Sequence, residues 1–399
     1  MSGFDHDIVV SGGGVAGLTA AAVFGAAGFD TLIVDPAPPI TERDAAGADL
    51  RSTAFLQPAR EVLDQAGLWA RLAPHAAPLQ VMRIVDAGGV EPEPRVTRDF
   101  DASDISDLPF GWNLPNWLLR REMVAHLDTL PNVTFRPGTG TTSLFTRETG
   151  ARVGLTDGTR LRTRLVVAAD GRGSPMREAA GIDVKTTRYG QKALAFAVTH
   201  PIPHGNVSTE IHRSGGPFTL VPLPDHEGMP SSAVVWMDEG PKVLRRAALD
   251  TDAFEAEMNA RSCLLFGPLK LASRRTTWPI ISQVAARMSG ERLALVAEAA
   301  HVVPPIGAQG LNMSLGDLRV LRDLVQANPD RLGDRQMLDA YHRARHAEVT
   351  IRVTGIDLLN RASMLSAQPL RDARARALDA LYAMAPVRKT LMQMGLGVR

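Results

Sequence analysis

The sequence predicts an α/β fold in which a parallel sheet is assembled from distant segments, an antiparallel sheet is inserted between them, and the C-terminus is helical. Three observations lead to this prediction. Residues 7–35 alternate between strand and helix around a glycine-rich turn. Two later apolar runs, Leu165 to Arg172 and Leu293 to Ala300, each carry an acidic residue near their end. Between them, stretches such as residues 192–201, 218–224 and 231–238 show the alternation and β-branched content of strands.

Composition and charge exclude several classes of protein. The chain has 399 residues, 45% of them hydrophobic and 22% charged, which is ordinary for a globular protein. A net charge of +1 argues against a nucleic-acid binder. One cysteine, Cys263, excludes an internal disulfide. The start "MSGFDHDIVV" lacks the bases of an export signal, and the apolar segment Val15 to Phe29 is too short to span a bilayer. We therefore expect a cytoplasmic chain, with a peripheral contact at the inner membrane left open.

The first motif indicates a dinucleotide site. "DIVVSGGGVAGLTAAAVFGAAGFDTLIVDP" reads as strand, turn, helix and strand, with Gly12, Gly14 and Gly17 spaced as G-x-G-x-x-G and Asp35 ending the second strand. In a Rossmann-type turn these glycines permit a tight turn, close approach of a pyrophosphate, and close packing of helix on sheet. An acid in the position of Asp35 binds ribose hydroxyls. A lone glycine motif also occurs in purely structural turns, and it does not distinguish NAD from FAD.

The loop "HVVPPIGAQGLNMSLGDL", from His301 to Leu318, is unusually apolar. Loops are usually polar because they face water, so this one is either buried or faces an apolar ligand. The apolar run before it carries Glu298, and the run at residues 165–172 carries Asp170. Acids at the ends of strands from distant segments suit a cofactor that lies across the carboxyl edge of a sheet.

These segments together resemble the FAD-dependent aromatic hydroxylases, and within them most closely the ubiquinone-biosynthesis hydroxylases. The resemblance rests on "GGGVAG", "AADGRGSPMRE" and "AEAAHVVPPIGAQGLNMSLGD", and extends to "ADLRSTAF", "NWLLRREM" and "GGPFTLVPLPD". It covers roughly Asp5 to Ala362. The motif near the end is the most specific, because its length and order make a chance match rare.

The resemblance implies a set of FAD contacts. The apolar loop would lie along the isoalloxazine ring, where Gly310, Leu311 and Asn312 would offer backbone amides at a helix start to the pyrimidine edge. A helix N-terminus there stabilises the negative charge of reduced flavin. Glu298 would reach the ribityl chain, Arg51 and Arg120 would lie along the cofactor, and Asp170 would lie near the pyrophosphate. The complete predicted set is Gly12, Gly14, Gly17, Asp35, Arg51, Arg120, Asp170, Glu298, Gly310, Leu311 and Asn312.

One strand ending departs from the family's pattern, and the histidines need separate interpretation. The family's commonest strand ending near the loop is Gly-Asp, whereas this chain has Ala297-Glu298, from which we expect a slight shift in flavin affinity. For His301 a packed structural role is favoured over a general base. His204 and His212 are expected to be solvated strand or turn residues. The histidines show no spacing that would hold a metal, so no metal site and no protein catalytic residue is assigned.

The resemblance also divides the chain. We expect an FAD-binding domain of three segments (1–75, 109–180 and 279–329), an antiparallel substrate domain of two segments (76–108 and 181–278), and C-terminal helices at 330–399. The last stretch, from Arg371, carries six bases, Arg399 among them, against two acids. A helical pair packed on the FAD domain is favoured there. An amphipathic surface for a membrane or a quinone-synthesis partner is the alternative.

The implied activity is that of an FAD-dependent monooxygenase. NAD(P)H or another donor reduces FAD, O₂ adds to the ring, and the flavin hydroperoxide hydroxylates an aromatic substrate, here a prenylated phenol of ubiquinone biosynthesis. Arg213 and Lys192 are the bases of residues 192–238 that could instead hold a benzoate-type substrate. The alternatives are a hydroxylase of a small soluble aromatic, an isoprenoid reductase of the same fold, and a non-catalytic flavoprotein subunit. The ring position, the electron donor and the oligomeric state stay open.

Overall fold

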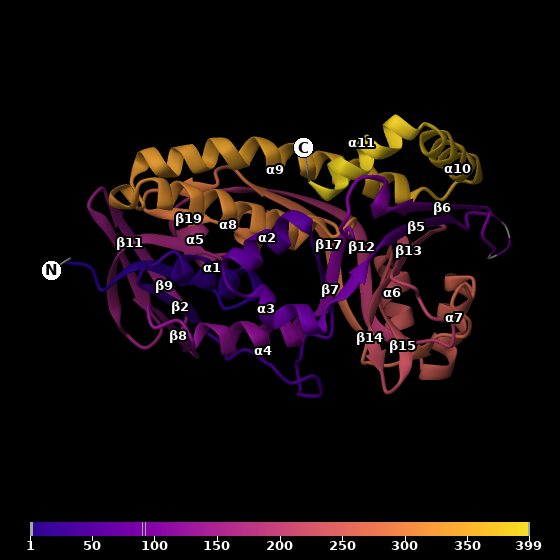
Figure 1. Cartoon of the computed structure of the whole chain (residues 1–399), viewed down its shortest axis with the longest axis horizontal. Coiled ribbons are helices and arrows are strands. Elements are labelled where there is room, and N and C mark those ends of the chain that lie inside the picture. The colour runs from indigo at the N-terminus through magenta and orange to yellow at the C-terminus, as the bar shows by residue number, and fades with distance from the viewer. Residues whose placement is uncertain (1–2, 90, 92, 398–399) are drawn as a thin grey trace.

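The computed structural model describes residues 3–89, 91 and 93–397. Two large sheets lie next to each other along the long axis of the molecule, and the long helix near the C-terminus runs over both of them (Figure 1). The expected α/β class, with a parallel sheet built from distant segments, is therefore confirmed.

The first sheet has the parallel core that the glycine motif predicts. Its strands are β1 (His6–Ser11), β2 (Thr31–Asp35), β8 (Val133–Pro137), β9 (Thr141–Arg147), β10 (Gly150–Leu155), β11 (Arg160–Ala168), β18 (Ser289–Gly290) and β19 (Leu293–Leu295). The order β19-β11-β1-β2-β8 is parallel, and β9 and β10 extend it as an antiparallel ribbon. Its central strands are buried on both faces, as continuous apolar runs such as residues 8–10 require. Helix α1 (Val15–Ala26) follows β1 directly and is buried along most of its length.

The second sheet is largely antiparallel. Its strands are β5 (Val81–Asp86), β6 (Val96–Asp101), β12 (Val184–Thr199), β13 (Val207–His212), β14 (Pro217–His226), β15 (Met229–Glu239), β16 (Lys270–Leu271), β17 (Thr276–Ala285) and β20 (His301–Val302). The one parallel pair on its main path, β13 with β5, joins the two expected segments of the substrate domain. One face packs Phe196, Phe218 and Trp236 against helices α6 (Gly240–Ala247) and α7 (Thr251–Ser262). The other face is thereby left for a cavity.

Short elements fill the junction between the sheets. Strands β3 (Ser52–Leu56), β4 (Ala77–Leu79) and β7 (Gly111–Pro115) form a third, small sheet that the sequence does not predict. Helices α2 (Gln57–Gln65), α3 (Trp69–Leu72), α4 (Asn116–Leu127) and α5 (Pro175–Ala179) complete the connections. The expected boundary at residue 278 falls inside β17, and β20 pairs with β17 in the second sheet.

Two strands expected from apolar runs are shorter than predicted. The run at 165–172 leaves the sheet after Ala168, and the run at 293–300 after Leu295. A 3-10 turn, Ala297–Ala299, replaces the rest of the second run. The physical reason is the backbone of Ala297, whose φ of 56° lies in the left-handed region and cannot continue a strand.

The C-terminal segment is helical as expected, with α8 (Gln309–Ala327), α9 (Arg335–Met364), α10 (Gln368–Ala383) and α11 (Ala385–Leu396). The expectation that the last pair packs on the FAD domain is wrong for most of its length. Arg374 binds Asp86 of β5 at 2.9 Å, and Arg388 binds Asp104 in the 3-10 turn after β6 at 3.3 Å, so α10 lies against the second sheet and α11 begins beside that turn. The end of α11 reaches α8, where the Gly395 carbonyl accepts a hydrogen bond from Gln309 at 3.0 Å. Arg399, one of the six bases, lies outside the described residues.

The described residues contain neither a membrane-spanning helix nor a group of side chains typical of a metal site. None of their helices is long and apolar enough to cross a membrane. Nor does that part of the chain group three or more His, Cys, Asp or Glu side chains where they could hold a metal ion.

Candidate cofactor and substrate site

A cavity of about 560 Å³ lies between the two sheets. One half of its wall comes from the glycine turn, β3, α4 and the start of α8, and the other half from the second sheet. Six of the residues predicted to contact FAD line it: Gly14, Arg51, Arg120, Glu298, Gly310 and Leu311. The fold thus brings together residues from four distant parts of the sequence.

The three glycines of the motif do different things. Gly12 has φ +106°, and a Cβ there would lie 2.4 Å from the Ala169 carbonyl oxygen, so this residue makes the turn. A Cβ on Gly17 would lie 1.8 Å from the Gly12 oxygen, so this residue lets the helix approach the turn. Gly14 is different, because a Cβ there would meet no atom within 4 Å and would point into open space at the cavity wall. Of the three glycines, only Gly14 could carry a side chain without a clash in the protein, so its glycine is explained by a ligand that approaches the backbone there.

Asp35 and Asp170 hold this turn in place. The Asp35 carboxylate accepts hydrogen bonds from the Gly13 and Ala37 amides at 2.5 and 2.8 Å. Asp170 Oδ2 accepts one from the Met176 amide at 3.2 Å, while its Oδ1 is buried without a partner. Burial raises the pKa of Asp170. Neither carboxylate is among the residues that line the cavity, although both lie next to residues that the turn presents to it.

Arg51 and Arg120 share one carboxylate at the cavity wall. Arg51 donates to Asp49 through Nε and Nη2 at 2.8 and 2.7 Å, and its guanidinium lies over the Trp278 ring, 5.3 Å from the centroid. Burial disfavours the Asp49 carboxylate, but hydrogen bonds from Arg51 and Asn116 outweigh it and hold the pKa of Asp49 below its ordinary value. Arg120 Nη2 lies 3.8 Å from Asp49, and Arg120 Nε is buried without a partner. One donor is therefore left to an anionic or polar ligand.

The apolar loop ends in a helix start that faces the cavity. The residue before α8, Ala308, has φ +55° and caps nothing with its side chain. The first amides of a helix have no partner within it, and at this end they belong to residues 308–311. Gly310 and Leu311 are among them and line the cavity. Asn312 is not among the lining residues, and its amide follows these first amides by one residue, so the flavin contact expected of it stays a prediction.

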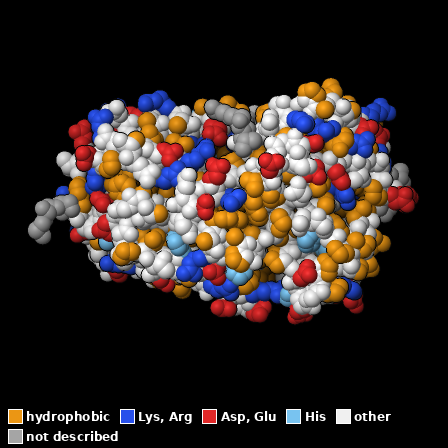
Figure 2. Space-filling model, viewed as in Figure 1, with side chains coloured by type: hydrophobic (Ala, Val, Ile, Leu, Met, Phe, Trp, Pro, Cys, Tyr) orange, Lys and Arg blue, Asp and Glu red, His pale blue; other side chains and the backbone are white. Residues whose placement is uncertain are grey.

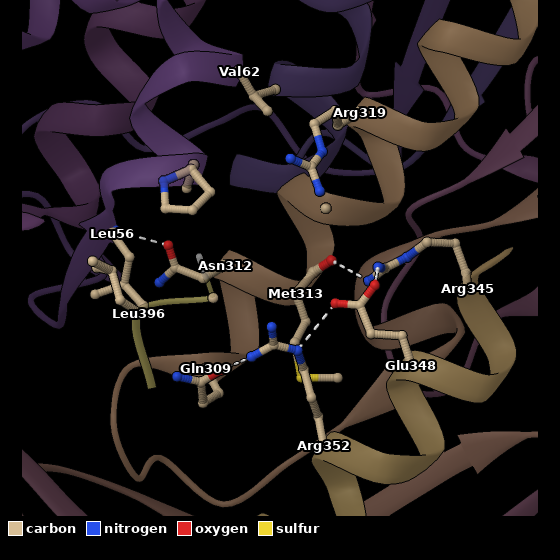
Figure 3. A pocket seen from close by; sticks show the side chains of 14 residues that line it. Leu56, Val62, Gln309, Asn312, Met313, Arg319, Arg345, Glu348, Arg352 and Leu396 are labelled. Atoms are coloured by element: carbon tan, nitrogen blue, oxygen red, sulfur yellow. Dashed lines mark hydrogen bonds and ion pairs between the residues drawn. The ribbon is translucent and has the colours of Figure 1, made fainter. Parts of the chain in front are cut away.

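The Asn312 side chain has a structural role. Its Oδ1 accepts a hydrogen bond from the Leu56 amide at 2.8 Å, and its Nδ2 donates to the Ala54 carbonyl at 2.7 Å. These bonds fix α8 to strand β3, and Figure 3 shows the bond between Asn312 and Leu56. A small cavity of about 50 Å³ lies there, between α2, α8 and α9.

His301 is packed beneath the loop, as favoured from the sequence. Its Nε2 lies 2.7 Å from Asp317 Oδ2, and Asp317 Oδ1 accepts a hydrogen bond from Arg345 Nε at 2.8 Å. All three side chains are almost fully buried. Burial alone would raise the pKa of Asp317, but His301 and Arg345 lower it below its ordinary value. This buried group joins the loop to α8 and α9.

The substrate half of the cavity is mostly apolar. The apolar residues that the second sheet contributes to its lining include Ala195, Val221, Ala233, Val235, Trp278, Pro279, Ile280 and Ile281. Arg213 and Lys192, the bases considered for a benzoate, are not among the lining residues. Sequence reasoning missed Glu210, which does line this half. Nothing local in the sequence marks it, because its position depends on how β13 pairs with β5.

The flavin half of the cavity fits FAD. It offers a glycine with open space beside it, two arginines of which one has an unpartnered donor, and the free amides of a helix start. These are the groups that bind a pyrophosphate and an anionic ring edge. The fold and the site together define a flavin-binding protein with a separate, apolar substrate chamber.

Comparison with known proteins agrees with that class. The model of the FAD binding domain family matches residues 5–354, and the chain belongs to this family. It is 31% identical to a ubiquinone hydroxylase, UbiL, of Rhodospirillum rubrum over 98% of this chain and 89% of that protein. It is 25% identical to 3-demethoxyubiquinol 3-hydroxylase of Escherichia coli over the full length of both. The structure of p-nitrophenol 4-monooxygenase from Pseudomonas putida shares the fold, with a TM-score of 0.79, 20% identity and coverage of 99% and 98%.

Proposed function

We propose that this chain is an FAD-dependent monooxygenase that hydroxylates an uncharged, apolar-substituted phenol in ubiquinone biosynthesis. The observation that carries the proposal is the division of one cavity into a half that fits FAD and a half that is apolar. FAD, when bound, supplies the chemistry that activates O₂. The protein binds both molecules, orients the ring and excludes water.

For the cofactor, we propose that Gly12, Gly14 and Gly17 present the turn to the pyrophosphate and that Asp35 lies near the ribose. Arg120, with its unpartnered Nε, and Arg51, fixed by Asp49, would lie along the cofactor. Gly310 and Leu311 would donate their amides to the flavin edge, and Glu298 and Asp170 would reach the ribityl and pyrophosphate groups. We further propose NAD(P)H as the electron donor. The test is whether the purified protein oxidises NAD(P)H and whether a phenol stimulates that oxidation.

For the substrate, three features support a phenol with a long apolar chain. The chamber wall is apolar, and neither of the bases considered for a carboxylate lines it. The named relatives over the full chain length are a ubiquinone hydroxylase and a 3-demethoxyubiquinol 3-hydroxylase. Binding of an isoprenoid chain to such a wall is favourable because it removes apolar surface from water.

Deletion of the gene in its host, followed by lipid extraction and mass spectrometry, tests the proposal. We expect an under-hydroxylated prenylphenol to accumulate and ubiquinone to fall, and a plasmid copy to restore both. Complementation by a variant that binds no FAD separates an enzyme from a non-catalytic subunit. Unchanged quinone content in a host without a second hydroxylase would contradict the proposal and favour a small soluble aromatic or an isoprenoid double bond as substrate.

We also propose a peripheral membrane contact, since such a substrate resides in lipid. Five apolar side chains are exposed along the last two helices, namely Leu370, Leu381, Met384, Leu391 and Met394. We call this set the C-terminal apolar surface. Figure 2 shows hydrophobic side chains at the upper right, where Figure 1 places these helices. Large exposed apolar patches commonly mark protein or membrane contacts.

A further inference from the structure

One acidic side chain stands in the otherwise apolar substrate chamber. Strand β13 is buried with a period of two, so that Thr209 and Ile211 enter the core beneath the sheet and Ser208, Glu210 and His212 face the other way. Ser208 and Glu210 line the cavity. Among the described residues that the second sheet contributes to the cavity wall, Glu210 is the one acidic side chain, and the other ionisable one, His301, is bound to the buried Asp317.

Glu210 is held by its neighbour two residues along the strand. His212 Nε2 lies 2.7 Å from Glu210 Oε1, and the two side chains are 15% and 16% exposed. A carboxylate is only an acceptor, so this close contact requires a proton between the two groups. His212 Nδ1 is buried without a hydrogen-bond partner. The expectation that His212 is a solvated residue is therefore wrong, because the pairing of β13 with β5 and β14 encloses this end of the strand.

A carboxylate in an apolar chamber is costly unless it receives hydrogen bonds. His212 approaches one of its two oxygens. Across the register, Glu210 faces Thr219 on β14 and Ile84 on β5. The carboxylate therefore lies where a bound ring with a hydroxyl substituent could donate to it.

We propose that Glu210, positioned by His212, is the hydrogen-bond acceptor that recognises a ring hydroxyl of the substrate. The inference rests on the proposed function and deepens it by naming how the chamber selects its substrate. A phenol donates an O–H to the carboxylate, whereas its methyl ether has no donor. A ring carboxylate is repelled by Glu210, so the same residue selects against benzoates.

Binding to the FAD-loaded enzyme tests the assignment. The probes are 4-pentylphenol, its methyl ether and 4-pentylbenzoate. The change in flavin absorbance measures the Kd of each. A hydrogen bond to a charged group predicts that the parent binds the phenol about tenfold or more tightly than the ether, with the benzoate weakest. In Glu210→Ala we expect the ratio of the two Kd values to fall to about one, since the acceptor is gone. In Glu210→Gln we expect part of the preference for the phenol to remain and the benzoate to bind more tightly than in the parent.

The ratio separates recognition from general damage, because a distorted chamber weakens the phenol and the ether alike. Glu239→Gln is the matched control, since Glu239 lies in the same sheet but is 56% exposed and pairs with Lys242 on the surface. His212→Asn should lower the phenol-to-ether ratio less than Glu210→Ala does. If Glu210→Ala fails to fold, the nearly isosteric Glu210→Gln is used instead. Tighter binding of the benzoate to that variant than to the parent supports the proposal, and unchanged binding contradicts it.

The outcomes distinguish this inference from the function beneath it. If the parent binds and hydroxylates the phenol but Glu210→Ala keeps the parent's ratio, the role of Glu210 is wrong and the proposed function stands. If none of the three probes perturbs the flavin and no phenol is hydroxylated, the proposed function fails and the role of Glu210 with it.

Discussion

Gly14 is the residue at which the cofactor assignment can be tested most cleanly. Its φ of −69° and ψ of 175° suit any side chain, and a Cβ there meets no protein atom within 4 Å. We expect Gly14→Val to fold but to lose FAD, because its methyl groups would occupy the space of the pyrophosphate. The measurement is the flavin content of the purified protein, which we expect to fall from about one FAD per chain to less than about a tenth.

Gly355 is the matched control, since a Cβ there also meets nothing within 4 Å but lies on α9, away from the cavity. Gly355→Val should keep its FAD. Circular dichroism of both variants shows whether they fold. Full FAD content in a folded Gly14→Val protein would mean that the glycines serve only the turn.

At the residue scale, the sequence predicted what depends on local backbone and missed what depends on register. The roles of Gly12 and Gly17 follow from spacing alone and agree with the contacts of the turn. Asn312 was expected to offer its amide to the flavin, but only the structure shows that its side chain binds the backbone of β3. Glu210 and His212 share a face because they lie two residues apart on β13, but that this face lines the cavity depends on pairing with β5, more than a hundred residues away, which no local pattern reports.

At the element scale, the placement of helix α8 depends on Asp317. Its carboxylate is fully buried between His301 and Arg345 and fixes the helix whose first turn faces the flavin half. We expect Asp317→Asn to lower the free energy of unfolding by about 3–5 kcal/mol, because it leaves Arg345 without its buried counter-charge. Urea unfolding of the FAD-loaded protein measures the loss.

Asp323→Asn is the control on the same helix. Asp323 is 57% exposed and pairs with Arg322 at the surface, so we expect a loss of no more than about 1 kcal/mol.

The lowered pKa of Asp317 also predicts how its contribution to the free energy of unfolding changes with pH. Its contribution is present above the ordinary pKa and is lost as the pH falls through the lowered value, so the gap between parent and Asp317→Asn should close in acid. Equal stability of the two proteins at neutral pH would contradict this account.

The elements around α8 show where sequence patterns stop being sufficient. The helix, the loop before it and the apolar strand β19 were all expected. The strand ends early because Ala297 adopts a backbone that glycine prefers. A hydrophobic run alone predicts burial, and it does not report such a change in φ.

At the scale of the whole molecule, apolar runs predicted some strands of each sheet, and the family resemblance supplied the order in which the segments alternate. The sequence did not predict the third sheet, which consists of three strands of five residues or fewer. It also placed the last helices wholly on the FAD domain. Their docking on the second sheet combines a small apolar cluster around Met392 and Leu396 with ion pairs to β5, to the residue before β6 and to the turn after it, and such pairs leave no periodic signal in a single sequence.

That docking makes the membrane contact testable in a specific way. Arg374 and Arg388 face Asp86 and Asp104, so two of the tail's bases are already paired within the protein. Binding to lipid should therefore depend more on apolar insertion than on anionic headgroups. We expect the protein to sediment with phosphatidylcholine vesicles, and only a few-fold better when phosphatidylglycerol is added.

Substitutions on the C-terminal apolar surface should then weaken binding to vesicles while FAD content stays unchanged. Leu391 and Met394 are 44% and 64% exposed on α11, and burying each in lipid is worth about 1.5–3 kcal/mol. The double variant L391E/M394E should bind neutral vesicles at least about tenfold more weakly. Phe145→Glu changes an equally exposed apolar residue on β9, in the other sheet, and should bind like the parent. If L391E/M394E also binds like the parent, or the parent binds no vesicles, this surface does not contact lipid, and the substrate must reach the chamber by another route.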